Sequence, residues 1–186
     1  SAHHVPLLAS SHTVIFREAF DSTENFLKNK SGVAHVNNLG VQGTPCSRVT
    51  YTPSSSGTPV IETSVAINDT NRLEYTLEYY LFFEPGFEWI KGGKLPGFRG
   101  GPLSVSTTGC VKPQPKNAWS YRLMWKQNGN VCLYIYDQSR LINHDDCGVV
   151  TQTTNPVFKV GQWHRLQLYV KINSQANAND GAAELW

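Results

Sequence analysis

Apolar and polar residues alternate with a period of two through much of this 186-residue chain. The longest such run covers residues 73–83, where leucine and aromatic residues alternate with mostly polar ones until Pro85 and Gly86 end it. Residues 119–126, 131–136 and 163–172 repeat the pattern. A period of two is typical of a strand that buries one face. With turn signals between the runs, the pattern predicts an all-β jelly-roll sandwich of two antiparallel sheets, with a substrate cleft on one sheet face. The one expected helix is short, Ser22–Lys28, with Ser22 as its N-cap.

Register can be predicted for one pair of strands. Asn128 and Gly129 lie between residues 119–126 and 131–136. A two-residue loop would place a core position opposite a polar one. A three-residue loop over 127–129 keeps the apolar positions together, and Gly129 supplies the left-handed residue that such loops need. This register puts four polar side chains on one face, with Ser120 opposite Tyr136 and Arg122 opposite Tyr134.

Length and composition set further limits. We expect residues 1–186 to form a single domain and a monomer. The chain begins at Ser1, so we expect any secretory segment to have been removed. A net charge of +2 does not by itself predict a polyanionic partner. No apolar run approaches a membrane span, no nucleic-acid motif appears, and no His, Asp or Glu set has ligand spacing; we therefore expect no membrane, nucleic acid, metal or cofactor.

Four cysteines without Cys-x-x-Cys spacing favour two disulfides and a secreted, extracellular protein. Four cysteines allow three pairings. We expect Cys132 to bond Cys147, because they are close in sequence, which leaves Cys46 to bond Cys110.

Residues 91–101 are a short segment rich in cationic residues and glycine. They hold three cationic side chains, Lys91, Lys94 and Arg99, and five glycines, and we expect a loop there that presents Lys94 to an anionic ligand. The block Lys-Gly-Gly-Lys-Leu-Pro-Gly, followed by Ser120-x-Arg122 and Tyr134-x-Tyr136, resembles polysaccharide lyase family 14 alginate lyases of molluscan and algal-virus type. The similarity extends from about residue 16 to the end. Because family members continue beyond this point, the chain is expected to lack its C-terminal strands.

The resemblance implies endolytic β-elimination on alginate, an anionic uronate polysaccharide, with a preference for mannuronate-rich regions. It also implies that Lys94, Ser120, Arg122, Tyr134 and Tyr136 form the catalytic centre. In our hypothesis, Arg122 and Ser120 hold the carboxylate, while Tyr134 or Tyr136 exchanges protons at C5 and O4. Lys94 either stabilises the enolate or acts as the base, and this choice stays open.

Other residues and functions are weaker candidates. Lys91, Arg99, Glu78 and Tyr80 are expected to contact substrate. Glucuronan is the alternative substrate, and a non-catalytic lectin is the alternative function. A glycoside hydrolase is disfavoured, because no Glu-x-Asp-x-x-Glu run supplies the two carboxylates that its chemistry needs.

Overall fold

The protein is described by a computed structural model that places residues 12–53, 62–69, 71–110, 118–138 and 147–186. The chain gathers into two compact units, Ser1–Arg72 and Leu73–Trp186, which are described separately below. The single catalytic domain expected over residues 1–186 stays a prediction. No helix in the described segments has the length and apolar character needed to cross a membrane.

The N-terminal unit contains one small antiparallel sheet. Strand β1 (Val33–Val36) pairs with β2 (Cys46–Val49), and the short 3-10 turn η1 (Val41–Gly43) lies between them. Residue Val36 lies opposite Cys46 in this register. Within its described residues, this unit contains no other strand or helix.

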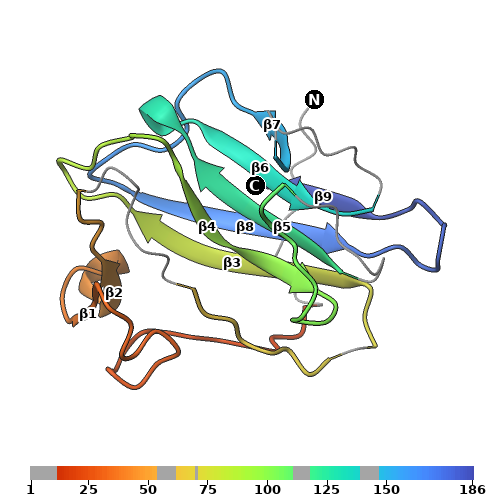
Figure 1. The fold of residues 1–186 in the computed structure, drawn as a ribbon. Helices are drawn as coiled ribbons and strands as arrows, with labels where there is room; N and C mark the ends of the chain where they lie inside the picture. The colour runs from red at the N-terminus through yellow and green to blue at the C-terminus, as the bar shows by residue number, and fades with distance from the viewer. Residues whose placement is uncertain (1–11, 54–61, 70, 111–117, 139–146) are drawn as a thin grey trace. The chain divides into compact units, whose positions relative to one another are not determined.

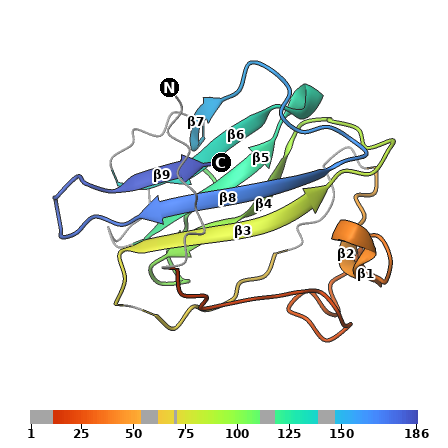
Figure 2. The ribbon, with the colours of Figure 1, turned by 180° about the vertical axis from the view of Figure 1, so that it is seen from behind.

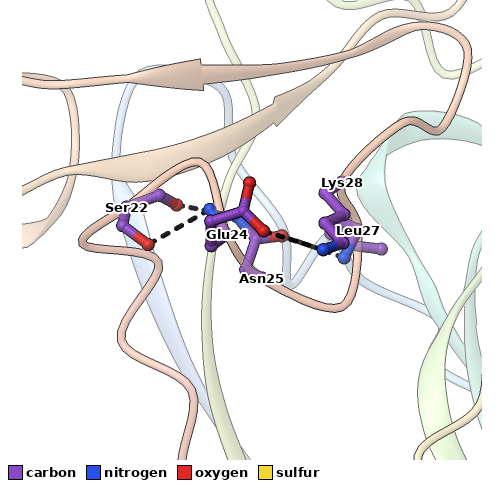
Figure 3. A network of polar contacts seen from close by, with 5 residues as sticks. All are labelled: Ser22, Glu24, Asn25, Leu27 and Lys28. Carbon is purple, nitrogen blue, oxygen red and sulfur yellow. Dashed lines mark hydrogen bonds and ion pairs between the residues drawn. The ribbon is translucent and has the colours of Figure 1, made fainter.

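The helix expected over residues 22–28 does not form, and this prediction was wrong. Side chains there bond to nearby backbone instead, as Figure 3 shows. The Glu24 amide donates to Ser22 Oγ at 3.1 Å, and the Leu27 amide donates to Asn25 Oδ1 at 2.9 Å. Lys28 and Glu24 form an exposed ion pair at 2.7 Å. Ser and Asn side chains that bond the backbone two residues on stabilise turns in competition with a helix.

The C-terminal unit is a sandwich of two antiparallel sheets, which confirms the predicted fold class (Figures 1 and 2). One sheet has the order β3-β8-β9 and the other the order β4-β5-β6-β7. Their bounds are β3 (Glu74–Phe82), β4 (Gly93–Gly100), β5 (Trp119–Trp125), β6 (Val131–Tyr136), β7 (Val149–Gln152), β8 (Trp163–Lys171) and β9 (Ala182–Leu185).

The inward faces of both sheets share one hydrophobic core. Strand β5 contributes Leu123 and β8 contributes Leu168, each with 0% of its surface exposed. Aromatic rings gather around Phe83, which lies 4.6 Å from Trp89 and 5.9 Å from Trp125 between ring centroids. Buried aromatic side chains supply large apolar contact areas. The alternation read from the sequence therefore identifies the strand faces that pack into this core, although in β6 the opposite face, with Cys132, Tyr134 and Tyr136, is buried as well.

Two core tyrosines connect the sheets by hydrogen bonds. Tyr121 of β5 donates to the carbonyl of Glu184 in β9 at 2.8 Å, and Tyr79 of β3 donates to the carbonyl of Pro96 in β4 at 3.3 Å. Burial raises the pKa of both phenols, so both stay protonated and able to donate. Each hydroxyl group thus has a carbonyl acceptor in the opposite sheet.

Residues 93–100 form a strand, so the loop expected there was wrong for most of its length. Strand β4 pairs with β5, but the register shifts between Lys94 and Gly97. Lys94 lies opposite Met124 and Gly97 lies opposite Arg122, so two residues of β4 face one residue of β5. Proline has no amide to donate and is tolerated at such a bulge, which explains Pro96 inside a strand.

The glycines of β4 allow close approach of aromatic side chains. A Cβ atom at Gly93 would overlap the indole of Trp125, and one at Gly100 would overlap the indole of Trp119. Both tryptophans are the cross-strand partners of these glycines. The glycine-rich sequence therefore reflects packing of β5 indoles against β4.

The β5–β6 hairpin has the predicted register. Ser120 lies opposite Tyr136, Arg122 opposite Tyr134, and Leu123 opposite Leu133. The connecting turn η2 spans Gln127–Gly129, three residues as predicted. Its conformation differs in one respect, because Asn128 (φ 62°) is left-handed as well as Gly129 (φ 79°).

Candidate active site

A cluster of polar side chains lies on the outward side of the β4-β5-β6-β7 sheet. We call this surface the tyrosine face and define it by Lys94, Ser120, Arg122, Tyr134 and Tyr136. Strand β4 supplies the lysine, β5 the serine and arginine, and β6 the two tyrosines. The β4 bulge and the β5–β6 register together bring these side chains to one surface.

Two side chains of basic residues lie close to the Tyr134 ring. The Nζ atom of Lys94 is 5.1 Å from the centroid of the Tyr134 ring, and the Cζ atom of Arg122 is 5.2 Å from it. Both distances are within the range of a cation–π interaction. Lys94 is exposed, whereas Tyr134 keeps only 7% of its surface accessible. The site therefore combines an accessible amine with a nearly buried phenol.

Tyr136 is at the centre of a hydrogen-bond network. Its hydroxyl lies 2.9 Å from the hydroxyl of Tyr134. It donates to the carbonyl of Cys147 at 3.0 Å and accepts from the amide of Cys110 at 3.0 Å. Tyr136 has 0% of its surface exposed. Tyr136 is thus built to hold Tyr134 in place, while Tyr134 is nearer to solvent.

Burial, followed by the hydrogen bond with Tyr136, raises the pKa of Tyr134 to about 12, although Arg122 acts to lower it. Desolvation therefore outweighs the cationic neighbour. The Arg122 guanidinium does not bring the pKa of Tyr134 below its ordinary value. Its phenol is protonated at neutral pH, a state that suits a proton donor.

Ser120 and Arg122 share a backbone partner. The Ser120 hydroxyl donates to the carbonyl of Thr107 at 3.0 Å, and Arg122 Nη2 donates to the same oxygen at 3.1 Å. Ser120 is 2% exposed. A guanidinium carries five N–H donors, so Arg122 can bind a carboxylate as well as Thr107. Ser120, in contrast, is committed to anchoring the segment around Thr107.

The predicted disulfide pairing was wrong. The structure joins Cys110 to Cys147, so neither Cys132–Cys147 nor Cys46–Cys110 can form. Cys132 lies on β6, is fully buried, and is outside the disulfide. The sequence separation of 37 residues corresponds to roughly 4 kcal/mol of stabilisation in the chain-entropy model. Proximity in sequence was a poor guide, because Cys147 lies beside Tyr136 and Cys110 in the fold.

The remaining cations of the 91–101 segment have different surroundings. Lys91 is exposed at a bend before β4 and has a left-handed backbone (φ 58°). Arg99 lies opposite Ser120, but its Nη2 atom donates to the carbonyls of Pro102 (3.0 Å), Leu103 (3.1 Å) and Val105. Arg99 thus holds the segment after β4 in place.

Glu78 and Tyr80 do not join the tyrosine face. They lie on the outward side of β3, in the opposite sheet. Oε2 of Glu78 accepts bonds from Arg165 Nη2 at 2.8 Å and Gln167 Nε2 at 2.6 Å. The structure therefore separates these two residues from Tyr134 by the whole sandwich.

A groove of about 610 Å³ lies at the edge between β6–β7 and β9, and it includes Leu133, Pro156 and Leu185 in its lining but none of the five residues that define the tyrosine face. In the described part of the chain, no group of three or more His, Cys, Asp or Glu side chains could hold a metal ion. The absence of a cofactor stays a prediction.

Sequence reasoning missed the backbone that surrounds the two phenols. Thr107, Cys110 and Cys147 all bond residues of the tyrosine face through main-chain atoms. Gly148 lies against the Tyr136 ring, and a Cβ atom there would overlap it. Any residue type can supply a main-chain hydrogen bond, so these contacts could not be predicted from the sequence. The only available signs were the four cysteines and Gly148.

An antiparallel sandwich that carries lysine, arginine and paired tyrosines on one sheet face has the groups needed for proton transfer at an anionic substrate. The family model for polysaccharide lyase 14 matches residues 41–186, and the chain belongs to this family, as the sequence motifs predicted.

Individual relatives are more distant. The exolysin of Paramecium bursaria Chlorella virus 1 is 27% identical over 128 residues, which is 55% of this chain and 20% of the viral protein. The chain thus spans about a fifth of that relative's length. The marine PL-14 alginate lyase from Aplysia kurodai has a TM-score of 0.55 at 19% identity, with 83% of this chain and 69% of that chain covered. The Chlorella virus alginate lyase vAL-1 has a TM-score of 0.49 at 24% identity, covering 64% and 56%.

Proposed function

We propose that this chain is an alginate lyase that cleaves mannuronate-rich regions endolytically by β-elimination. The observation that carries the proposal is that the Lys94 side-chain nitrogen and the Arg122 guanidinium both lie close to the Tyr134 ring on an outward sheet face. Family membership supplies the class of reaction, and the Lys-Gly-Gly-Lys-Leu-Pro-Gly block, which resembles the alginate lyases of the family, supports the substrate.

β-Elimination requires a C5 proton to leave carbon beside a carboxylate that is already negative. In the proposal, Arg122 binds this carboxylate, because the planar guanidinium matches two carboxylate oxygens. Neutralising the carboxylate makes the C5 proton more acidic and stabilises the enolate that forms. Groups aimed at developing charge usually supply the largest catalytic contribution.

Two proton transfers remain. Tyr134 protonates the leaving O4 oxygen, since its pKa of about 12 keeps it protonated near neutral pH. In the proposal, Lys94 enters the reaction as a neutral amine and accepts the C5 proton to become an ammonium; its Nζ atom is the accessible group beside the phenol, 5.1 Å from the ring centroid. This assignment gives the base to the exposed group and the acid to the buried one.

The other residues of the tyrosine face act through these three. Tyr136 positions Tyr134 through their hydroxyl contact at 2.9 Å. Ser120 and Thr107 position Arg122: the Thr107 carbonyl accepts hydrogen bonds from the side chains of both Ser120 and Arg122. Lys91 is proposed to attract the anionic polymer from its exposed bend.

We also propose a secreted, extracellular location, supported by the Cys110–Cys147 disulfide. Disulfides persist in oxidising compartments. Mass measurement of the cysteines after expression with and without an export signal tests this point: the Cys110–Cys147 disulfide should form in the exported protein, and an exported protein that folds with both cysteines reduced would remove the support for this location.

The test uses polymannuronate, polyguluronate and glucuronan with the purified protein. The ultraviolet absorbance of the unsaturated product should rise fastest with polymannuronate, and viscosity should fall early, as endolytic cleavage requires. Lys94→Ala should reduce the rate at least about 100-fold, while Lys159→Ala, which removes another exposed lysine, should leave it unchanged. Faster cleavage of glucuronan would overturn the substrate, and binding without product would favour a lectin.

A further inference from the structure

The Cys110–Cys147 disulfide joins the two backbone segments that hold Tyr136. The amide of Cys110 donates to the Tyr136 hydroxyl at 3.0 Å, and that hydroxyl donates to the carbonyl of Cys147 at 3.0 Å. Both bonds come from main-chain atoms of the two bonded cysteines themselves. The disulfide thus links the two residues whose main-chain atoms bond the Tyr136 hydroxyl.

The number of available protons indicates which tyrosine donates in the hydrogen bond between Tyr134 and Tyr136. A phenol has one proton, and Tyr136 gives its proton to Cys147. The contact of 2.9 Å between the two hydroxyls must therefore be donated by Tyr134. Without substrate, the Tyr134 proton is therefore directed at the Tyr136 oxygen, and in the proposed reaction it turns from that oxygen to O4 when substrate is bound.

The backbone at both cysteines is held in an unfavourable conformation. Cys110 has φ 61° and Cys147 has φ 33°, in the left-handed region that residues with a Cβ atom rarely adopt. Their Cα atoms are 4.6 Å apart although 37 residues separate them in sequence. Gly148 then approaches the Tyr136 ring so closely that a Cβ atom would not fit. Such a conformation persists where surrounding structure imposes it.

We propose that the Cys110–Cys147 disulfide is a positioning element for the reaction, which sets the Tyr134 proton through Tyr136 and makes turnover sensitive to reduction. This inference rests on the proposed lyase function. Both cysteines are half-buried, so a small dithiol can reach the bond. A dithiol reductant gives two electrons and two protons to the disulfide; two cysteine thiols form, and the reductant becomes a cyclic disulfide.

The experiment compares oxidised protein with protein fully reduced by dithiothreitol, with the redox state verified by mass. Reduction should lower kcat on polymannuronate about 10- to 100-fold, because small displacements of a catalytic group are costly. KM should change less than about threefold, and reoxidation should restore kcat. A reduced protein that keeps kcat within about twofold would overturn the proposal. Cys46→Ser, as a control, should respond like wild type.

Tyr136→Phe separates positioning from general support of the fold. If the disulfide acts through this hydroxyl, reduction of Tyr136→Phe should lower its kcat by less than about twofold further. If reduction only unfolds the protein, wild type and Tyr136→Phe should lose activity by the same factor. The second outcome would contradict the proposal.

Hydrogen exchange at the Cys110 amide gives a measurement that needs no substrate. Exchange should be slow in oxidised wild type and at least about 10-fold faster after reduction and in Tyr136→Phe. Unchanged exchange on reduction would overturn the proposal even if activity fell. Responsive exchange in a protein that cleaves no uronate polymer would support the positioning role of the disulfide while refuting the lyase function.

Discussion

Replacing Tyr134 and Tyr136 separately by phenylalanine should damage the protein in two different ways. Each change removes one oxygen and keeps the ring. Tyr136→Phe deprives the Cys110 amide and the Cys147 carbonyl of their shared partner inside a fully buried site. Tyr134→Phe removes the donor to Tyr136 but leaves both of those backbone bonds in place.

The expected magnitudes follow from these contacts. An unsatisfied buried polar group costs about 1–3 kcal/mol, so Tyr136→Phe should lower the free energy of unfolding by roughly 2–4 kcal/mol. Tyr134→Phe should lower it by only about 1 kcal/mol. Turnover should show the reverse order: loss of a general acid costs about 10²–10⁴-fold, and Tyr134→Phe should fall in that range.

Urea unfolding followed by tryptophan fluorescence measures the first quantity, and steady-state kinetics on polymannuronate measures the second. The loss in Tyr134→Phe should lie mainly in kcat rather than KM. A Tyr134→Phe enzyme within about threefold of wild type would refute its role as the acid and pass proton transfer to Lys94. Equal stability losses in the two variants would refute the hydrogen-bond network around Tyr136.

Three further outcomes test the fold and its electrostatics. Gly93→Ala should lower the free energy of unfolding by about 1–3 kcal/mol, because its Cβ overlaps the Trp125 indole; a urea midpoint equal to wild type would contradict this packing. Burial lowers the pKa of His164 below its ordinary value of 6.5, and its Nε2 atom accepts from the Lys159 amide. The folded state therefore binds the proton less readily than the unfolded chain, so its stabilisation is present above pH 6.5 and is lost as pH falls below it. His164→Gln should flatten the dependence of Tm between neutral pH and pH ~5, and an unaltered slope would rule this out. Arg165→Ala should change turnover less than about twofold, because Arg165 lies on β8 in the sheet opposite the tyrosine face, and loss of its surface ion pair with Glu78 should cost little stability; a large loss of kcat would show that the β3–β8 face takes part in the reaction.

The sequence predicted those parts of the fold that depend on side-chain pattern. Alternation identified β3, β5, β6 and β8, and the conflict between polar and core positions selected the register of the β5–β6 hairpin. A one-residue slip would turn every side chain of a strand to the other face, so this register was strongly determined.

Features that depend on backbone contacts were not predicted. Residues 93–100 read as a loop because their glycines hide the strand, and the packing of Trp125 and Trp119 against them is visible only in three dimensions. The disulfide was mispaired because the positions of Cys110 and Cys147 beside Tyr136 depend on tertiary structure. Glu78 has the outward direction expected on its strand, but the pattern could not say which sheet that strand joins.

The mass of the product formed from polymannuronate tests the central claim most directly. Elimination cleaves the chain without adding water, so each new non-reducing end should carry a double bond and be lighter by one water than a hydrolysis product. The oxidised wild-type protein should form such unsaturated oligosaccharides, and Tyr134→Phe should form them roughly 100-fold or more slowly. Saturated products, or unsaturated products formed equally fast by Tyr134→Phe, would contradict it.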